Sequence, residues 1–332
     1  MCSHWVSYSG AAATANERCA LTQIMAPDAG ALARIAGQFG VEPSGIRQLP
    51  AGEANHAWLL GDELVLRIPR DSGPLADDLR KERVVIPIAR GAGVRTPEIV
   101  AFEEHPAGLG VPYMVLRRVS GADIERLTLP ATASEAIYRE VGRQLAVLHN
   151  ATVNERVASS LIPVDTGRHD PRLLLPPIVR DGGLDGETAE WLRSWFDRLA
   201  PFVPDDPPVV LIHGDIAPRN LMVDPASGEF RAVIDWGDAA LAEPAMDFAK
   251  LPLAMLPATL EGYLGHDDWS GDDLRSWQAR AFRYHLHWAV AAIDRRVPET
   301  GSPRPPGPAM ARLLVVLRFL ADTTDDRWRW RW

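Results

Sequence analysis

An aspartate, an asparagine and a second aspartate stand at fixed spacing between short apolar runs of the chain. Residues 209–212 form a run of the buried-strand kind, which delivers Asp215 to a loop. Asn220 follows, and two further apolar runs that read as a hairpin end at Asp235. One carboxylate can orient and deprotonate a hydroxyl, while the amide and the second carboxylate can hold Mg²⁺ on phosphates. The spacing therefore predicts a site for phosphoryl transfer.

The hairpin before Asp235 is the element that returns the second aspartate to the asparagine. Its strands are predicted at 221–223 and 230–234, with a turn at 224–228. The resulting Asp-x-x-x-x-Asn and following Asp match the catalytic loop and the metal-binding aspartate of protein kinases. Aspartate and asparagine are also ordinary turn formers. Several polar residues at fixed offsets between apolar strands are nevertheless a tighter pattern than a lone glycine motif, so we favour the chemical interpretation.

The two motifs also identify a family resemblance. With His213-Gly214-Asp215 in place of His-Arg-Asp, and Ile234-Asp235-Trp236 in place of Asp-Phe-Gly, the chain resembles the aminoglycoside phosphotransferase family, the small-molecule branch of the kinase-like fold. The resemblance extends over about residues 26–320. It implies that Asp215 is the catalytic base and that Asn220 and Asp235 bind the metal. Because the family includes macrolide, homoserine and choline kinases, it implies a reaction more firmly than a substrate.

A buried cation is expected in the third predicted strand. This strand, at 63–68, carries Arg67 where the family usually has a phosphate-binding lysine. Arginine keeps the charge and can hold two phosphate oxygens through its planar fork. In the next helix Glu82 lies on the apolar stripe, where a carboxylate needs a cation. The resemblance pairs Glu82 with Arg67, and Pro87 is expected to kink or end that helix.

Two further segments resemble nucleotide contacts of the family. Gly52 and Asn55, between two predicted strands, look like a short form of its nucleotide-covering loop, although a single glycine in a hairpin is often only a turn. The stretch 112–121 resembles the family hinge, which implies backbone contacts to the adenine edge at Arg117 and Val119. An ordinary strand leading into a linker is the alternative for this stretch.

Three polar residues near the motifs are expected to support the site rather than to react. His213 stands in the same loop as the base. Asp247, in E-P-A-M-D-F-A, matches a family aspartate that begins a helix and braces the catalytic loop. Asp238 is expected either to assist the metal or to face the substrate.

Composition narrows the class of protein and its partners. The 332 residues can bury a large core. A net charge of −9 argues against nucleic acid and anionic membranes as partners and suits a cationic acceptor, and no apolar run approaches the ~20 residues of a membrane span. The two cysteines, Cys2 and Cys19, precede the first predicted element, which fits a reducing cytoplasm. Lysine occurs only at Lys81 and Lys250, and neither is placed to replace Arg67.

The order of elements, read with the resemblance, predicts an α+β, bilobal protein-kinase-like fold. Residues 1–24 show neither helical nor strand period and are expected to be a disordered extension. Residues 25–119 would form the N-terminal nucleotide-binding lobe, with an antiparallel sheet and the hinge at its end. Residues 120–332 would form the mostly helical C-terminal lobe, with the catalytic loop and the acceptor site.

The resulting functional hypothesis is a Mg²⁺-dependent kinase of small molecules. It would move the γ-phosphoryl group of ATP or GTP to a hydroxyl, with an aminoglycoside-type antibiotic as the favoured acceptor. Macrolides, hygromycin-type compounds, homoserine and choline stay open as acceptors. A non-catalytic nucleotide-binding regulator is the alternative from another class. The intact Asp215, Asn220 and Asp235 argue against that alternative, since a binding module needs no base.

Overall fold

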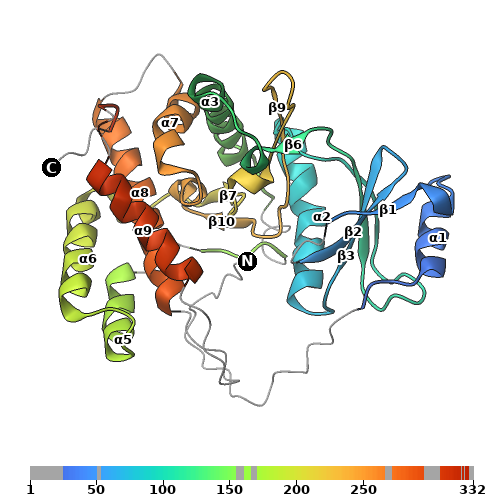
Figure 1. Cartoon of the computed structure of the whole chain (residues 1–332), viewed down its shortest axis with the longest axis horizontal. Helices are drawn as coiled ribbons and strands as arrows, with labels where there is room; N and C mark the ends of the chain where they lie inside the picture. Colours follow the sequence, from blue (N-terminus) through green and yellow to red (C-terminus); the bar gives the residue numbers. More distant parts are fainter. Residues whose placement is uncertain are drawn as a thin grey trace.

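The computed structural model describes residues 25–50, 54–154, 161–165, 170–265, 271–294, 307–322, 324 and 326–328. The expected disorder of residues 1–24 lies outside these ranges, and so does Gly52. The described chain forms two lobes, one built around an antiparallel sheet and one built mostly of helices (Figure 1). The α+β, bilobal fold predicted from the sequence is confirmed.

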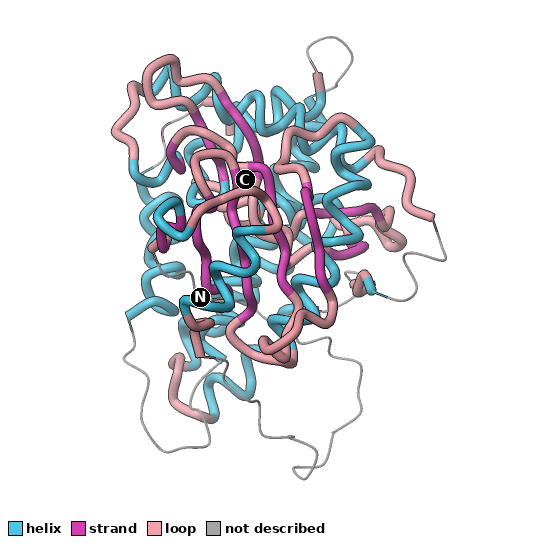
Figure 2. The backbone as a smooth tube through the Cα atoms, turned by 90° about the vertical axis from the view of Figure 1, so that its right-hand side faces the viewer, coloured by secondary structure: helices cyan, strands magenta, loops and turns pink. Residues whose placement is uncertain are grey.

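A five-stranded antiparallel sheet forms the first lobe. Its order is β1-β2-β3-β5-β4, and the strands lie side by side in Figure 2. The strands are β1 (Ile46–Gln48), β2 (Asn55–Leu60), β3 (Leu64–Pro69), β4 (Ile99–Glu103) and β5 (Tyr113–Arg117). Helix α1 (Ala29–Gly37) packs on one face, while α2 (Pro74–Ala92) lies on the side of the second lobe (Figure 1).

Alternation along β3 assigns its side chains to two different environments. Leu66 and Ile68 are fully buried in the core that the sheet shares with Ile35 of α1. Val65 and Arg67, the intervening residues, point to the opposite face, where they line a cleft. A single strand therefore contributes both to the core and to the wall of the cleft.

Helix α2 runs through Pro87 to Ala92, so that of the two outcomes expected at this proline, a kink or an end, the end is wrong. Proline removes one backbone hydrogen bond from a helix interior. Here the neighbouring residues Ile86 and Ala89 are buried in the main core, and their packing favours a continuous helix. The helix ends at Gly93, whose φ of 105° suits a left-handed cap.

The second lobe consists of helices packed around short strands. Its main helices are α3 (Ala131–His149), α5 (Leu175–Arg180), α6 (Gly186–Leu199), α7 (Leu256–Leu264), α8 (Gly271–Asp294) and α9 (Gly307–Asp322). Its strands are β6 (Ala122–Asp123), β7 (Val210–Ile212), β8 (Leu221–Val223), β9 (Phe230–Val233) and β10 (Ala240–Ala242). Among the described residues, no helix has the length and hydropathy needed to cross a membrane.

Helices α3 and α7 meet at a seam of two glycines. A Cβ at Gly142 would lie 1.9 Å from the carbonyl oxygen of Thr259, and a Cβ at Gly262 would lie 1.8 Å from that of Arg139. No side chain fits at either position, so the two backbones can approach this closely only because both residues are glycine. The contact sets the end of α3 beside α7.

Candidate active site

Buried hydrogen bonds to the carboxylate of Asp247 fix the backbone of the loop that follows β7. Oδ2 of Asp247 accepts from the backbone N–H of His213 at 2.9 Å, and its Oδ1 accepts from that of Gly214 at 2.7 Å. His149 of α3 lies 3.0 Å from the same Oδ2 through Nε2, and its Nδ1 lies 3.0 Å from the hydroxyl of Tyr263 on α7. Asp247 is 1% exposed, so these contacts replace the water that a carboxylate would otherwise bind.

The imidazole of His213 links the two predicted motifs. Its Nδ1 accepts a hydrogen bond from the backbone N–H of Asp215 at 3.2 Å, and its Nε2 lies 3.1 Å from the carbonyl oxygen of Ile234. Burial lowers the pKa of His213, against the opposing effect of nearby carboxylates. The ring is therefore neutral, with Nε2–H donating to Ile234. His213 thus fixes the position of the base relative to the residue before Asp235.

Two cations and an amide surround the carboxylate of Asp215, which is 6% exposed. Oδ1 forms an ion pair with Nζ of Lys250 at 2.8 Å. Oδ2 pairs with Arg219 and accepts from Nδ2 of Asn220 at 2.8 Å. Burial raises the pKa of Asp215, but Lys250 and Arg219 outweigh it, so that the pKa lies below its usual range. The carboxylate is therefore ionised.

Asn220 and Asp235 lie next to each other, as the hairpin predicts. The backbone N–H of Ile234 donates to the carbonyl oxygen of Asn220 at 2.9 Å. Both hydrogen bonds of the Asn220 amide nitrogen go to Asp215, so its Oδ1 is the atom left for a cation. Asp235 adopts a φ of 68°, which few residues other than glycine tolerate, and its carboxylate is half exposed.

The oxygens of Asn220 and Asp235 fit Mg²⁺. This ion prefers oxygen ligands and is often held by one or two protein groups together with substrate phosphates. Within the described residues, no cluster of three or more His, Cys, Asp or Glu side chains is arranged to hold a metal. An amide oxygen and one carboxylate at the wall of a cleft match the mode in which substrate phosphates complete the coordination.

Arg67 joins the N-terminal sheet to both a helix and the second lobe. It pairs with Glu82 of α2, and its Nη2 lies 2.9 Å from Oδ1 of Asp235. Burial lowers the pKa of Arg67, but the two carboxylates outweigh it and raise the pKa overall. Burial raises the pKa of Glu82 to about 7, although Arg67 works in the opposite direction. Arg67 is therefore a permanent, oriented cation at the edge of the cleft.

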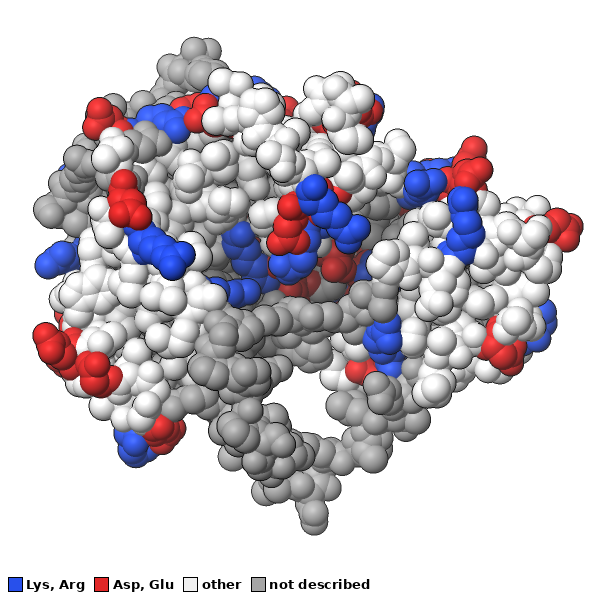
Figure 3. Space-filling view, viewed as in Figure 1, with Lys and Arg blue, Asp and Glu red and all other residues white. Residues whose placement is uncertain are grey.

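A cleft of about 460 Å³ lies between the lobes and gathers most of the predicted nucleotide contacts. Its lining includes Asn55, Arg67, Glu82, Arg117, Val119, Asn220 and Asp235. Oδ1 of Asn55 is buried there and has no hydrogen-bond partner among the residues that the structure describes, which suits a polar ligand group. Asp215 is not part of this lining and adjoins it through Asn220. Figure 3 shows charged side chains of both signs in the recess between the lobes.

Both residues predicted for the hinge, Arg117 and Val119, line the cleft. The backbone N–H of Arg117 donates to Glu98 O at 2.8 Å, and that of Arg118 donates to Glu63 O at 2.7 Å. The N–H of Arg117 is thus used in pairing between segments, and contacts of this stretch with adenine stay a prediction. Val119 lines the cleft beyond the last residue of β5 and is the better candidate for the donor.

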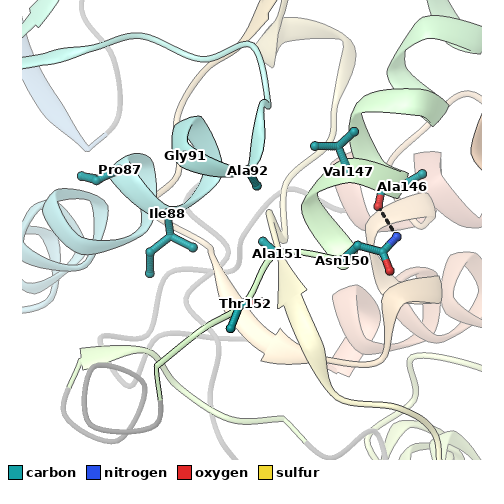
Figure 4. Close-up of a pocket in the computed structure, with 9 residues that line it drawn as sticks. All are labelled: Pro87, Ile88, Gly91, Ala92, Ala146, Val147, Asn150, Ala151 and Thr152. Atoms are coloured by element: carbon teal, nitrogen blue, oxygen red, sulfur yellow. Dashed lines mark hydrogen bonds between the residues drawn. The ribbon is translucent and has the colours of Figure 1, made fainter.

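A larger hollow of about 760 Å³ lies between the ends of α2 and α3 (Figure 4). Its lining consists of small and apolar side chains with Asn150 and Thr152 as the polar groups, and it contains no ionisable side chain. Asn150 donates to the carbonyl oxygen of Ala146 within this wall. Among the described residues, several ionisable side chains predicted for the site therefore line the smaller cleft, and none of them lines this hollow.

Sequence reasoning missed two contacts of the base. Arg219 stands four residues after Asp215, so the spacing within the short helical turn at Pro218–Asn220 was a signal for it. Lys250 also contacts Asp238, whose Oδ2 lies 3.3 Å from Nζ, and no local pattern links these residues. Asp238 thus lies close to the proposed base, and its role toward the metal or the substrate stays a prediction.

Comparison with known proteins places the chain among phosphotransferases. The mouse protein named acyl-CoA dehydrogenase family member 10 is 25% identical over 244 residues, which make up 70% of this chain and only 22% of that protein. The GDP and kanamycin complex of APH(2″)-IIIa has a TM-score of 0.63 at 21% identity, covering 84% of this chain and 93% of that one. A macrolide 2′-phosphotransferase from Brachybacterium faecium has a TM-score of 0.58 at 21% identity, covering 90% and 99%.

The two solved structures share the fold of this chain, and their low identity carries no statement about its substrate. The resemblance seen in the sequence motifs is confirmed independently of them. The model of the phosphotransferase enzyme family matches residues 45–299, and the chain therefore belongs to this family.

Proposed function

We propose that this protein transfers the γ-phosphoryl group of ATP or GTP to a hydroxyl of a small molecule. The observation that carries the proposal is the contact of Asp215 with Asn220, which places an ionised carboxylate beside the cleft that holds Arg67 and Asp235. A base, a cation and two oxygen ligands are the groups that phosphoryl transfer needs from a protein. Membership of the phosphotransferase family supports the reaction class.

The reaction balances with these groups alone as protein participants. The acceptor oxygen forms a bond to the γ-phosphorus while the bond from that phosphorus to the bridging oxygen breaks. The departing nucleoside diphosphate keeps the electron pair, and the proton of the acceptor hydroxyl passes to Asp215. Because the transition state is loose, alignment of the hydroxyl and stabilisation of charge contribute more than the strength of the base. The depressed pKa of Asp215 is compatible with such a role.

The remaining residues would hold the donor. Arg67, oriented by Glu82, would bind phosphate oxygens through its planar fork. Mg²⁺ held by Asn220 and Asp235 would neutralise charge on the phosphates. Asn55 and the N–H of Val119 would contact the nucleotide at the sheet side of the cleft. Gly52 is proposed for the covering loop from the sequence alone. Two lines of reasoning, a nucleotide substrate and a chain with only two cysteines, favour the cytoplasm.

An aminoglycoside-type antibiotic is the acceptor that we favour, which would make the protein a resistance enzyme. The net charge of −9 suits a polycation, and one similar structure was solved with kanamycin. Another similar structure is a macrolide phosphotransferase, so an uncharged macrolide is the second candidate. Homoserine and choline are smaller acceptors of the same chemical kind. The ionised, fully supported base argues against a regulator that only binds nucleotide.

The test is a nucleotide-consumption assay with ATP and GTP against a panel of hydroxyl compounds, antibiotics first. Wild type should release diphosphate with at least one acceptor, and Asp215→Asn should lower kcat by ~10²-fold or more while nucleotide binding persists. Raising ionic strength should increase KM for a polycationic acceptor, since charge interactions are screened over ~10 Å at 0.1 M, and leave KM for a macrolide unchanged. Turnover by Asp215→Asn at the wild-type rate would refute the proposal.

A further inference from the structure

Lys250 is a buried ammonium group in direct contact with the proposed base. Nζ lies 2.8 Å from Oδ1 of Asp215 and 3.3 Å from Oδ2 of Asp238. It also lies 5.1 Å from the centre of the Trp288 ring, on helix α8. The side chain is only 6% exposed. None of these contacts belongs to the donor cleft, whose lining includes neither Lys250 nor Asp215.

The two oxygens of Asp215 have different surroundings. Oδ1 is buried, with Lys250 as its cation. Oδ2 is shared by Asn220 and Arg219, and the side chain of Arg219 is 45% exposed. An acceptor hydroxyl can therefore reach Oδ2, where it would take the place of a solvated arginine, but not Oδ1. The buried Lys250 would therefore keep its contact with Asp215, while the more exposed Arg219 can be replaced by the acceptor.

A purely structural explanation for Lys250 is unfavourable on energetic grounds. Burying an ammonium group costs several kcal/mol, and a buried ion pair often stabilises a protein no better than apolar residues of similar volume. The fold therefore gains little from a lysine here. A rigid partner for the base is a different benefit, because the carboxylate torsion of aspartate is broad and roughly two-fold when nothing holds it.

The backbone around Asp238 is fixed by a second contact. Gly214, next to the base, has a φ of 79°, and a Cβ there would lie 2.2 Å from the carbonyl oxygen of Asp238. The loop that carries Asp238 thus packs directly on the catalytic loop. Lys250 bridges the same two loops through their side chains. Backbone packing and the ion pairs together make one rigid wall on the acceptor side of Asp215.

We infer that Lys250 is a positioning residue for phosphoryl transfer: it holds Oδ1 of Asp215 so that Oδ2 faces the acceptor hydroxyl. This inference rests on the proposed function. In the reaction, Lys250 keeps its protons, and Oδ2 takes the proton of the hydroxyl as its oxygen bonds to phosphorus. Arg219 leaves Oδ2 when the acceptor binds. Asp238, held by the same ammonium, limits the directions from which the acceptor approaches.

The experiment compares Lys250→Met and Lys250→Arg with wild type in kcat, KM for each substrate, nucleotide Kd and Tm. Misplacing a reacting group by about 1 Å costs on the order of 10²-fold, so Lys250→Met should lower kcat by that factor while nucleotide KM and Kd stay unchanged. Lys250→Arg should recover part of kcat. Arg172→Met, which removes the 2.6 Å ion pair to Asp197 on α6, is the control and should keep kcat.

A double-mutant cycle separates the inference from the function on which it rests. If Lys250 acts through Asp215, Lys250→Met should cost little further kcat in an Asp215→Asn background. Equal, additive losses in both backgrounds, or wild-type kcat in Lys250→Met, would overturn the inference and leave the kinase function intact. Undiminished turnover by Asp215→Asn alone would remove the function itself. If Lys250→Met fails to fold, the kcat of Lys250→Arg tests the inference. This variant places its positive charge differently from lysine, so a wild-type kcat would also contradict a positioning role.

Discussion

Arg67 and Asp235 form an ion pair of 2.9 Å that crosses from one lobe to the other, between residues 168 positions apart in the chain. The arginine thereby holds the carboxylate that we propose for Mg²⁺. When a metal nucleotide binds, Arg67 would pair with phosphate oxygens and Asp235 with the divalent cation. Each of the two groups would thus replace its present partner by another group of opposite charge. Neither the buried arginine nor the half-exposed carboxylate would be left without an opposite charge at any stage.

Arg67→Ala should raise the nucleotide KM and lower kcat, because the cation for the phosphates is lost and Glu82 is left buried without it. Arg67→Lys should keep substantial activity, since it restores a positive charge without the planar fork. The measurement is steady-state kinetics with nucleotide varied at saturating acceptor. Arg47→Ala is the control, because Arg47 pairs with Asp62 on the exposed side of the same sheet. Unchanged nucleotide KM in Arg67→Ala would exclude the phosphate role.

Asp247→Ala should destabilise the protein by roughly 3 kcal/mol, because the N–H groups of His213 and Gly214 would be left buried and unsatisfied. Asp247→Asn should cost less, since its amide oxygen still accepts one of these bonds. Urea denaturation followed by circular dichroism measures both. Asp224→Ala removes a carboxylate that caps an exposed turn and should change stability little. Equal effects of Asp247→Ala and Asp224→Ala would contradict the bracing role.

Gly214→Ala should lower both stability and kcat, since its Cβ would collide with the carbonyl oxygen of Asp238 and push the two loops apart. Gly228→Ala isolates the backbone component. Its φ of 70° is close to the 79° of Gly214, but a Cβ there meets nothing within 4 Å. Gly228→Ala should therefore cost only the ~1 kcal/mol of a left-handed residue and leave kcat unchanged. Comparable kcat values in the two variants would show that the close approach is unimportant.

Stability should fall as the pH drops from 6.5 to 4, in part through His285. Burial lowers the pKa of this histidine to about 4, with Arg312 acting in the same direction and a hydrogen bond to the backbone of Phe248 opposing it. The unfolded chain takes up a proton near pH 6.5 and the folded chain only near pH 4, so the contribution is on the order of 3 kcal/mol, present above pH 6.5 and lost below it.

Urea midpoints between pH 4 and pH 8 measure this effect. His285→Phe removes the titrating group and should flatten the curve between pH 4 and 6.5. His105→Gln, at an exposed position of the β4–β5 turn, should keep the wild-type slope. A slope in His285→Phe as steep as that of wild type would assign the pH dependence to other groups.

The sequence was sufficient for the fold and for those contacts of the candidate site that are local or follow from one hairpin. Strand β8 (Leu221–Val223) has the bounds that were predicted, and the hairpin brings Asn220 next to Ile234 because Leu221 pairs with Val233. Helical spacing put Glu82 on an apolar stripe, where a carboxylate needs a cation, and the family resemblance pointed to Arg67 as that cation. Each of these assignments involves only one repeating pattern in the sequence and one partner residue.

The contacts that were not predicted from the sequence depend on how segments distant in the chain pack against one another. Lys250 reaches Asp215 only because Pro244–Phe248 forms a tight 3₁₀ turn beneath the catalytic loop, which no spacing in the sequence reveals. The N–H of Arg117 likewise donates to the carbonyl oxygen of Glu98, a pairing with a remote segment that the strand pattern of 113–119 does not give by itself. In both cases the partner of a group was decided by packing of remote segments.

The glycine seam of α3 and α7 has a mechanical consequence for the distant loop that carries the base. The seam fixes the distance between His149 and Tyr263, whose side chains meet at 3.0 Å, and His149 in turn holds Asp247. A methyl group at Gly142 would push α3 and α7 apart. The displacement would pass from Tyr263 to His149, from His149 to Asp247, and from Asp247 to the N–H groups of the catalytic loop. The spacing of α3 and α7 is thus coupled to the position of the proposed base, Asp215. A substitution at the seam, remote from any substrate, can therefore abolish activity.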